Sequence, residues 1–549
     1  MCTLSNGQIR TDDPIAERLY GWLQAVLDNP EIWEGAFTLA CQLRDRPLEE
    51  PVTGLILSAL EKEPEGALPG DYQQQLRIAR AAMAVYEENL NHSILRKLAS
   101  WCEMLELQWD MVSAERSVRI QPGDWMEFLV RFYRLTGIKA VLRLCTRLRA
   151  TAMDWTTLLH SFHQRKPLSA QLSPEEIHIL MKDESGNESD FMVRQALINR
   201  AELLADGIRY AAYSGIFSGN GQELSAGEKG WSAVNRDHGA VCGGTTADVL
   251  LAGKATNRGI YAAAIAAWTE AFISQAMLQG APWAMDALSR IVHNALPACI
   301  GAKEPVMYQR VNSLREDPGS AGCAAPEDGT DSVHVLARLA RALGAARKAA
   351  VTAMPEGFSL NLSLPGMFVL GLGNEMISVR ISGTDAVLRS SNGLRGEFTL
   401  FLADTEIRPV RVQMGEQEAE TKRPEQVREG TYLLLKGDGS RSCRISYGES
   451  EHLVVLSTHH EGICCFSGPR LLTLEARNGT FRTAACGEPV LVDGQPMIPV
   501  CDVSGWINRD GIPADVPVLP KTEGETRLEP MYPYSETPVR IAVFPRARA

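Results

Sequence analysis

The sequence predicts a multidomain α and β protein, in which an (α/α)6-type helical toroid is followed by an antiparallel β-sandwich. Three features lead to this fold class: the size of the chain, a helical period in its first part and an alternating period in its last. With 549 residues, 45% of them hydrophobic, the chain can bury a sizeable core and should divide into at least two domains. We expect the toroid over residues 1–352 and the sandwich over residues 353–549.

From about residue 10 to about residue 350, apolar residues recur at helical spacing between short polar breaks. The clearest stripe, in DWMEFLVRFYRLTG, consists of Trp125, Phe128, Leu129, Phe132 and Leu135. It stops at Gly137, a residue type favoured just after a helix. Paired helices with short loops suit an antiparallel array closed into a ring. Further helices are expected over Ile15 to Leu27, Tyr72 to Asn89, Ser93 to Leu107, Phe191 to Tyr213, Ile260 to Leu278, Pro282 to Ala298 and Ser332 to Lys348.

After about residue 353 the apolar residues alternate instead. In GFSLNLSLPG, Phe358, Leu360, Leu362 and Leu364 share one face. Turn signals such as SSNGLRG, KGDGSR and VDGQP follow at short intervals, as in an antiparallel sandwich. The adjacent pair Cys464 and Cys465 lies in the apolar run EGICCF, which we interpret as a buried strand.

The charge balance excludes several classes of partner. The formal net charge is -12 and the basic residues are scattered, so a nucleic acid is a poor partner. No stretch is long and apolar enough to span a membrane, and the start lacks the pattern of an export signal, which predicts a cytoplasmic protein without a membrane partner.

The 12 cysteines lack the spacing of a disulfide framework, so most should be reduced and buried.

Several local strings resemble glycoside hydrolase family 127, the β-L-arabinofuranosidases. The first is DWMEFLVRFYRLTG with AVLRLC and MDWTTLLHSF, where Asp154 and Trp155 match an Asp-Trp-Thr step of the family. The second, DHGAVCGGTTADVLLAG, is similar to a family segment with a His-Gly pair and a Gly-Asp-Glu loop. The third, APWAMDALSRIVHNALPA, is similar to a family helix, and FSGPRLL and RIAVFP resemble two sandwich strands. The resemblance implies a six-hairpin glycosidase-like toroid with a β-sandwich.

The family uses a cysteine thiolate as nucleophile, held on zinc by a glutamate and further cysteines, with a second glutamate as acid/base. This sequence departs from that set. The Gly-Asp-Glu positions hold Ala247, Asp248 and Val249, so the acid/base glutamate is replaced by an apolar residue. The ligands after an Arg-Gly pair fall at Tyr261 and Ala263.

The family's adjacent cysteines fall within GCAAP, which keeps at most Cys323. One thiol without further ligands at suitable spacing is not a structural zinc site. We therefore expect the zinc and thiolate mechanism to be lost, with no metal and no cofactor.

Two carboxylates are candidate catalytic residues. Asp248 lies in a Gly- and Thr-rich loop between predicted helices, where a toroid would open its pocket; the alternative is a turn or helix cap. Glu270 lies beside Trp268 in IAAWTEAFISQ, and a buried carboxylate near an aromatic ring would suit a general acid. The alternative for Glu270 is a solvent-facing position. Glu327, Asp328 and Asp331 are weaker candidates, because a solvated loop and a helix N-cap explain them better than a pocket carboxylate does.

Four residues are candidates for substrate binding. His238 at a helix end could bond a sugar hydroxyl, although the helix dipole alone favours histidine there. Trp231, beside a glycine, is our preferred aromatic platform for a sugar, although most tryptophans of this half should be core. Tyr261 could donate a hydrogen bond from the vacated ligand position, next to Arg258 of the Arg-Gly pair.

The sequence thus predicts a glycoside hydrolase acting on small oligosaccharides or glycosides, arabinofuranosidase-like, through carboxylates without zinc. The alternative is a catalytically inactive, glycan-binding relative. A polysaccharide lyase would need a base beside a uronate site, and no such site is readable. The expected partner is a carbohydrate; the sugar, the linkage, the stereochemical outcome and the oligomeric state, including a homodimer, stay open.

Overall fold

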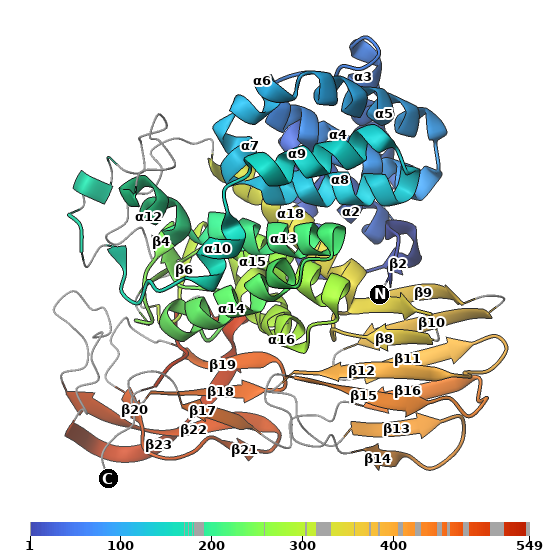
Figure 1. Ribbon diagram of the computed structural model, residues 1–549. Helices are drawn as coiled ribbons and strands as arrows, with labels where there is room; N and C mark the ends of the chain where they lie inside the picture. Colours follow the sequence, from blue (N-terminus) through green and yellow to red (C-terminus); the bar gives the residue numbers. More distant parts are fainter. Residues whose placement is uncertain are drawn as a thin grey trace.

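Helices occupy most of the chain up to residue 350, and strands follow from residue 351 (Figure 1). The computed structural model describes residues 2–544 apart from 45, 169–170, 174, 178, 180–190, 257, 302–304, 314–330, 356, 373–374, 383–384, 404–409, 423–429, 447–452, 458–461, 476–482, 505–520 and 538. None of the helices in this part of the chain has the length and apolar character needed to cross a membrane.

Within the described residues, six helix pairs form a ring, which confirms the predicted toroid. The helices that pack around the ring axis are α2 (Trp33–Leu43), α4 (Tyr72–Asn89), α8 (Pro122–Thr136), α13 (Ala201–Ser218), α15 (Ala262–Gln279) and α18 (Asp331–Ala350). Their outer partners, in the same order, are α3 (Arg46–Lys62), α5 (His92–Leu107), α9 (Lys139–Thr151), α14 (Gly221–His238), α16 (Pro282–Arg290) and α1 (Pro14–Gln24). Shorter helices complete this half: α6 (Trp109–Ala114), α7 (Arg116–Ile120), α10 (Trp155–His160), α12 (Phe191–Asn199), the π-helix η4 (Ile291–Ala295) and α17 (Leu296–Ile300).

The predicted stripe on α8 is buried except at its end. Trp125, Phe128, Leu129 and Phe132 are each at most 1% exposed, and Gly137 ends the helix with φ of 68°. Leu135 was wrongly placed in this stripe, because this side chain, in the last turn of α8, lines an open cavity and is 46% exposed. The helix predicted over Phe191 to Tyr213 is interrupted at Arg200, whose backbone is extended and bridges to Leu250.

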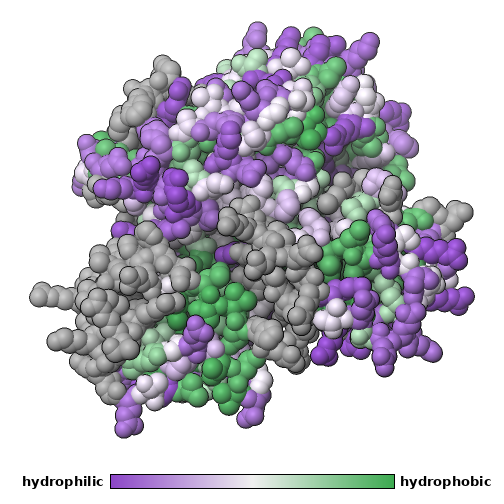
Figure 2. Space-filling model, turned by 60° about the horizontal axis from the view of Figure 1, so that its bottom comes forward, coloured by the Kyte–Doolittle hydropathy of each residue, from purple (hydrophilic) through white to green (hydrophobic). Residues whose placement is uncertain are grey.

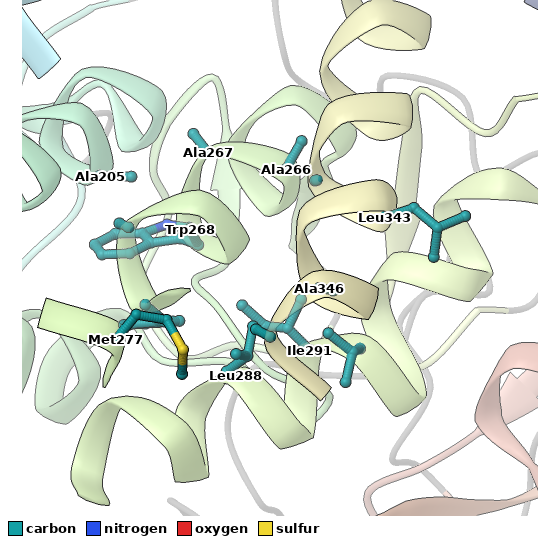
Figure 3. Packing of buried hydrophobic residues seen from close by; sticks show 14 of the residues in the cluster. Ala205, Ala266, Ala267, Trp268, Met277, Leu288, Ile291, Leu343 and Ala346 are labelled. Atoms are coloured by element: carbon teal, nitrogen blue, oxygen red, sulfur yellow. The ribbon is translucent and has the colours of Figure 1, made fainter. Parts of the chain in front are cut away.

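Small residues let the inner helices approach closely. Figure 3 shows Ala205 of α13, Ala266 and Ala267 of α15 and Ala346 of α18 among the larger side chains of the core. Between α2 and α18, a Cβ atom built on Gly35 would lie 2.6 Å from the Cβ of Ala340. α15 is buried on nearly all sides by its neighbours in the ring. An almost continuous apolar sequence suits a helix that has no face exposed to water.

The part from residue 351 onward forms two β units (Figure 1). The first has a five-stranded sheet in the order β1-β7-β8-β12-β15 and a seven-stranded sheet in the order β14-β13-β16-β11-β10-β9-β2. Its strands are β7 (Val351–Met354), β8 (Gly357–Leu360), β9 (Gly366–Leu372), β10 (Glu375–Ser382), β11 (Asp385–Ser390), β12 (Glu397–Leu402), β13 (Val410–Met414), β14 (Glu420–Lys422), β15 (Thr431–Lys436) and β16 (Ser442–Ser446). The predicted face of Phe358, Leu360, Leu362 and Leu364 is buried.

The N-terminal residues belong to this sandwich as edge strands. β1 (Cys2–Thr3) pairs with β7, and β2 (Ile9–Arg10) pairs with β9. Both pairings are antiparallel. The first residues of the chain therefore complete sheets made by residues more than three hundred positions later, which local periodicity could not indicate.

The second β unit is an eight-stranded sheet with a separate apolar core. Its strands are β17 (Val454–Ser457), β18 (Ile463–Ser467), β19 (Arg470–Glu475), β20 (Thr483–Ala485), β21 (Val490–Val492), β22 (Gln495–Ser504), β23 (Lys521–Pro533) and β24 (Arg540–Ile541). Cys464 and Cys465 are buried in β18, as predicted. Cys486 and Cys501 form a disulfide, a pair that the sequence spacing did not indicate.

The underside of the molecule carries exposed hydrophobic residues, as Figure 2 shows. Val490 and Val492 of β21 and Leu528 of β23 are among the exposed hydrophobic residues of the second β unit.

Candidate functional site

A small sheet covers one end of the helical ring. It has the order β4-β3-β5-β6, with β3 (Ala247–Asp248), β4 (Leu250–Leu251), β5 (Gly259–Tyr261) and β6 (Tyr308–Arg310). β5 leads directly into α15, Leu250 bridges to Arg200 just before α13, and His334 in the first turn of α18 contacts Glu202 in the first turn of α13. The sheet therefore lies where these inner helices begin, and we call this end the N-terminal mouth of the ring.

Two segments that carry predicted site residues meet at this mouth. β3 pairs in parallel with β5, with Ala247 opposite Ile260, so the backbone of Asp248 lies beside that of Tyr261. Arg258, half-buried, immediately precedes β5. Tyr261 is 5% exposed and its ring stacks on Tyr308 of β6 at 5.2 Å.

Val249, at the position of the family's acid/base glutamate, has an unusual backbone. Its φ is 70°, a left-handed conformation that costs a β-branched residue on the order of 1–3 kcal/mol. Its carbonyl accepts the N–H of Ala201 at 3.1 Å, at the start of α13. The side chain is only 9% exposed, so this position presents a packed apolar group to the mouth.

His238 is held by backbone groups on both ring nitrogens. Gly253 donates its N–H to Nδ1 at 3.0 Å, so Nε2 carries the proton and donates to the Gln164 carbonyl at 3.0 Å. Burial lowers the pKa of His238, which agrees with a neutral ring. Both nitrogens are used within the protein, so His238 fixes two loops at the mouth and has no ring nitrogen left for a sugar hydroxyl.

Trp231 lies in an aromatic cluster. Its ring is 5.0 Å from that of Trp268 and 4.6 Å from that of Phe272, and the residue is 8% exposed. Trp268 also donates its Nε1 hydrogen to Thr245 at 3.1 Å. A sugar platform needs an open ring face, whereas this arrangement is that of core packing between α14 and α15.

Glu270 lies on the ring axis among arginines. Its carboxylate is 3.1 Å from Arg209 and 3.1 Å from Arg341, and Arg338 approaches at 3.8 Å. Its selection as a general acid depended on apolar, aromatic surroundings, and guanidinium groups occupy those surroundings instead. The general-acid role therefore loses its physical basis.

These contacts belong to an ion network that fills the middle of the ring. Arg80 of α4 contacts Glu34 at 2.8 Å, Asp124 at 2.8 Å and Glu127 at 3.3 Å, so it joins α4 to α2 and α8. Burial would raise the pKa of Glu127, but Arg80 and Arg209 outweigh it and lower this pKa to about 2. The sequence did not single out Arg80, Glu127 or Arg209, although isolated charges within an apolar helix, such as Asp206 and Arg209 in ADGIRYAAYSG, were a usable signal.

Two carboxyls in the network are perturbed in opposite directions. Burial, with a smaller contribution from neighbouring Asp124, raises the pKa of Asp206 despite its contact with Arg209. Burial also acts on Asp124, but Arg209, Arg341 and Arg80 hold its pKa well below the usual value. Such a divergence can mark a catalytic pair. Here, however, the Asp206 side chain is 2% exposed and its oxygens bind Arg209 and the N–H of Gly123, which is a structural arrangement.

A cavity of about 620 Å³ opens on the other side of the network, towards the C-terminal ends of the inner helices. Glu127 and Glu270 line it, and both contact the same nitrogen of Arg209, at 3.5 and 3.1 Å. Their contacting oxygens are thus no farther apart than the sum of these two distances, because one guanidinium nitrogen bridges them. Tyr86 and Tyr213 also line the cavity.

The donor set at the family's metal position does not fit zinc. Tyr261 and Ala263 stand where a glutamate and a cysteine are implied, and a methyl group supplies no ligand. Within the described part of the chain, no group of three or more His, Cys, Asp or Glu side chains could hold a metal ion. Cys323, Glu327 and Asp328 lie outside the described residues, as does the side chain of Asp248.

The helical ring with its attached β units is the architecture of a class of glycoside hydrolases, and solved structures of that class match this chain. A structure described as a glycoside hydrolase matches over 100% of this chain and 97% of its own, with a TM-score of 0.72 and 12% identity. A GH127 β-L-arabinofuranosidase of Geobacillus stearothermophilus T6 matches over 96% of this chain and 92% of its own, with a TM-score of 0.67 and 14% identity.

A second GH127 β-arabinofuranosidase matches over 99% of this chain and 98% of its own, with a TM-score of 0.64 and 13% identity. No family model and no curated protein matches the sequence. The chain therefore has a GH127-like fold, which confirms the predicted resemblance at the level of the fold.

Proposed function

We propose that the protein is a glycoside hydrolase of small oligosaccharides or glycosides that works without zinc, with Asp248 as a catalytic carboxylate at the N-terminal mouth. One observation carries the proposal: the pairing of β3 with β5 brings Asp248 beside Tyr261 at the end of the ring where the inner helices begin. These are the segments that resemble the family's acid/base and ligand positions. Loops at such openings position catalytic groups on a rigid scaffold.

In this proposal, Arg258 and Tyr261 orient the sugar and His238 holds the loop after β4. Glu270 and the arginines around it hold the inner helices in register. A carboxylate mechanism requires a second carboxyl about 5–9.5 Å from the first. The shorter separation gives retention of configuration and the longer one gives inversion.

The test is hydrolysis of nitrophenyl furanosides and pyranosides, including L-arabinose, by the purified protein with and without a chelator. We expect release that resists the chelator and falls by at least about a hundredfold in Asp248→Asn, as when a general acid or base is removed. Asp110→Asn, on the exposed surface of α6, is the matched control and should retain full activity. Chelator-sensitive release would contradict the zinc-free mechanism, and full activity of Asp248→Asn would contradict the assignment of Asp248.

A glycan-binding protein without hydrolysis is the second candidate, and a specific observation favours it. The family's acid/base position holds Val249, buried and strained, and Glu270 is surrounded by arginines. If this candidate is right, no glycoside of the panel is cleaved, yet one of the sugars raises the melting temperature. Turnover of any glycoside at a rate that depends on Asp248 would exclude it.

A further inference from the structure

A second cavity, of about 650 Å³, lies where the ring meets both β units. Its lining includes Arg18 of α1, His293 of η4, Leu364 after β8, Arg470 of β19 and Arg540 of β24. It shares no lining residue with the cavity on the ring axis. Its volume is that of a site for a small organic molecule, which typically occupies about 300–1,000 Å³.

The cavity wall carries an excess of positive charge. Within the described residues, no carboxylate forms an ion pair with Arg18, Arg470 or Arg540. Asp13, which also lines the cavity, is ion-paired with Arg347, which is buried. The remaining acid of the lining is Glu536, which is exposed.

Arg540 is the most informative of these arginines because it is 4% exposed. Its guanidinium donates to the carbonyl of Thr537 at 2.8 Å, the side-chain oxygen of Gln309 at 3.0 Å and the carbonyl of Arg310 at 3.0 Å. It also lies over the ring of Tyr534 at 3.6 Å, and its buried Nε has no hydrogen-bond partner in the part of the chain that the structure describes. These neutral partners fix the orientation of the group but do not supply the negative charge that a buried cation requires.

The histidine that lines the cavity adds no charge near neutral pH. His293 places Nδ1 2.8 Å from the Ser289 carbonyl and Nε2 3.1 Å from the Ser363 hydroxyl. Burial lowers the pKa of His293 to about 4, so its ring is neutral. The arginines therefore determine the charge of the wall.

We propose that this cavity binds a small organic anion, of about monosaccharide size, whose carboxylate or phosphate is bound by Arg18 and Arg470 and is attracted by the buried positive charge of Arg540. A guanidinium presents donors that match the oxygens of either group. The volume exceeds what a bare inorganic ion needs. The cavity adjoins the sheet at the mouth through Gln309 and Arg310 of β6, but it contains neither Asp248 nor Tyr261 among its described lining residues and does not depend on the proposed hydrolase activity.

The test is titration calorimetry of the full-length protein with galacturonate, glucose 6-phosphate, inorganic phosphate and, as the neutral control, glucose. We expect one of the two anionic sugars to bind more tightly than inorganic phosphate and glucose not to bind. Binding of galacturonate alone would identify a carboxylate ligand, and binding of glucose 6-phosphate alone a phosphate ligand. Absence of binding by both at millimolar concentrations would overturn the proposal.

Variants locate the binding. Arg18→Gln and Arg470→Gln should each weaken binding about tenfold or more, as expected for loss of a charge-assisted hydrogen bond. Arg389→Gln, on the exposed side of β11, is the control and should bind as the unmodified protein does. Circular dichroism checks that each variant is folded. Unchanged affinity in both Arg18→Gln and Arg470→Gln would place the anion elsewhere and refute the assignment.

Discussion

Replacing Arg209 by Met should destabilise the helical ring by about 3–5 kcal/mol, the usual effect of removing one partner of a buried ion pair. The Arg209 side chain is 2% exposed and contacts Asp206 at 2.6 Å, Asp124 at 2.9 Å and Glu270 at 3.1 Å. Methionine preserves most of the length of the side chain, so the loss is mainly electrostatic. The variant leaves buried carboxylates of three helices without this cation.

The effect should depend on pH in a defined direction. The folded pKa of Glu127, at about 2, lies below its ordinary value, so its pairing stabilises the fold above about pH 4 and loses this effect as the pH falls towards 2. Without Arg209 the carboxylates protonate at higher pH, which relieves their repulsion. The difference in the free energy of unfolding between the unmodified protein and Arg209→Met should therefore be larger near pH 7 than near pH 4.

Urea unfolding followed by circular dichroism measures this difference. Arg143→Met is the matched control, because Arg143 pairs with Glu106 on the surface and is 55% exposed, and its midpoint should stay close to that of the unmodified protein. If Arg209→Met unfolds at the same urea concentration as this control, the network contributes nothing to stability and the reasoning is refuted.

Three further predictions test other features. Burial would lower the pKa of His334, but Glu202 and Glu31 raise it to about 9, so this pairing stabilises the fold below about pH 6.5 and loses its effect as the pH rises through 9. His334→Gln should therefore lower the melting temperature more near pH 6 than near pH 10, and an equal loss at both would contradict the ion pairs. Gly35→Ala should destabilise the protein, whereas Gly54→Ala, in open space on α3, should stabilise it by about 0.5–1 kcal/mol. Thermal melts measure both variants, and a lower melting temperature for Gly54→Ala than for Gly35→Ala would contradict the close packing of α2 on α18. Trp231→Phe should lower the melting temperature but leave sugar affinity unchanged, and a selective loss of affinity would restore Trp231 as a platform.

The sequence by itself determined the helical ring and the change to strands, because the period of apolar residues reports which face of each element is buried. The stripe of α8 and the alternating face after residue 357 are examples in which local pattern and burial agree. The boundary at Arg200 was missed, since its extended backbone is stabilised by a bridge to Leu250, a residue distant in the sequence.

The roles of individual polar residues were decided only by tertiary structure. The sequence shows His238 at a helix end and Glu270 in an apolar run, but their partners come from other segments. Gln164 and Gly253 bind His238, and Arg209 and Arg341 pair with Glu270. Arg540, which has no ion-pair partner among the described residues, likewise reaches its neutral partners only where β24 and β6 meet. Hydrogen bonds and ion pairs act over a few ångströms in space, and periodicity along the chain carries no record of which distant groups will meet.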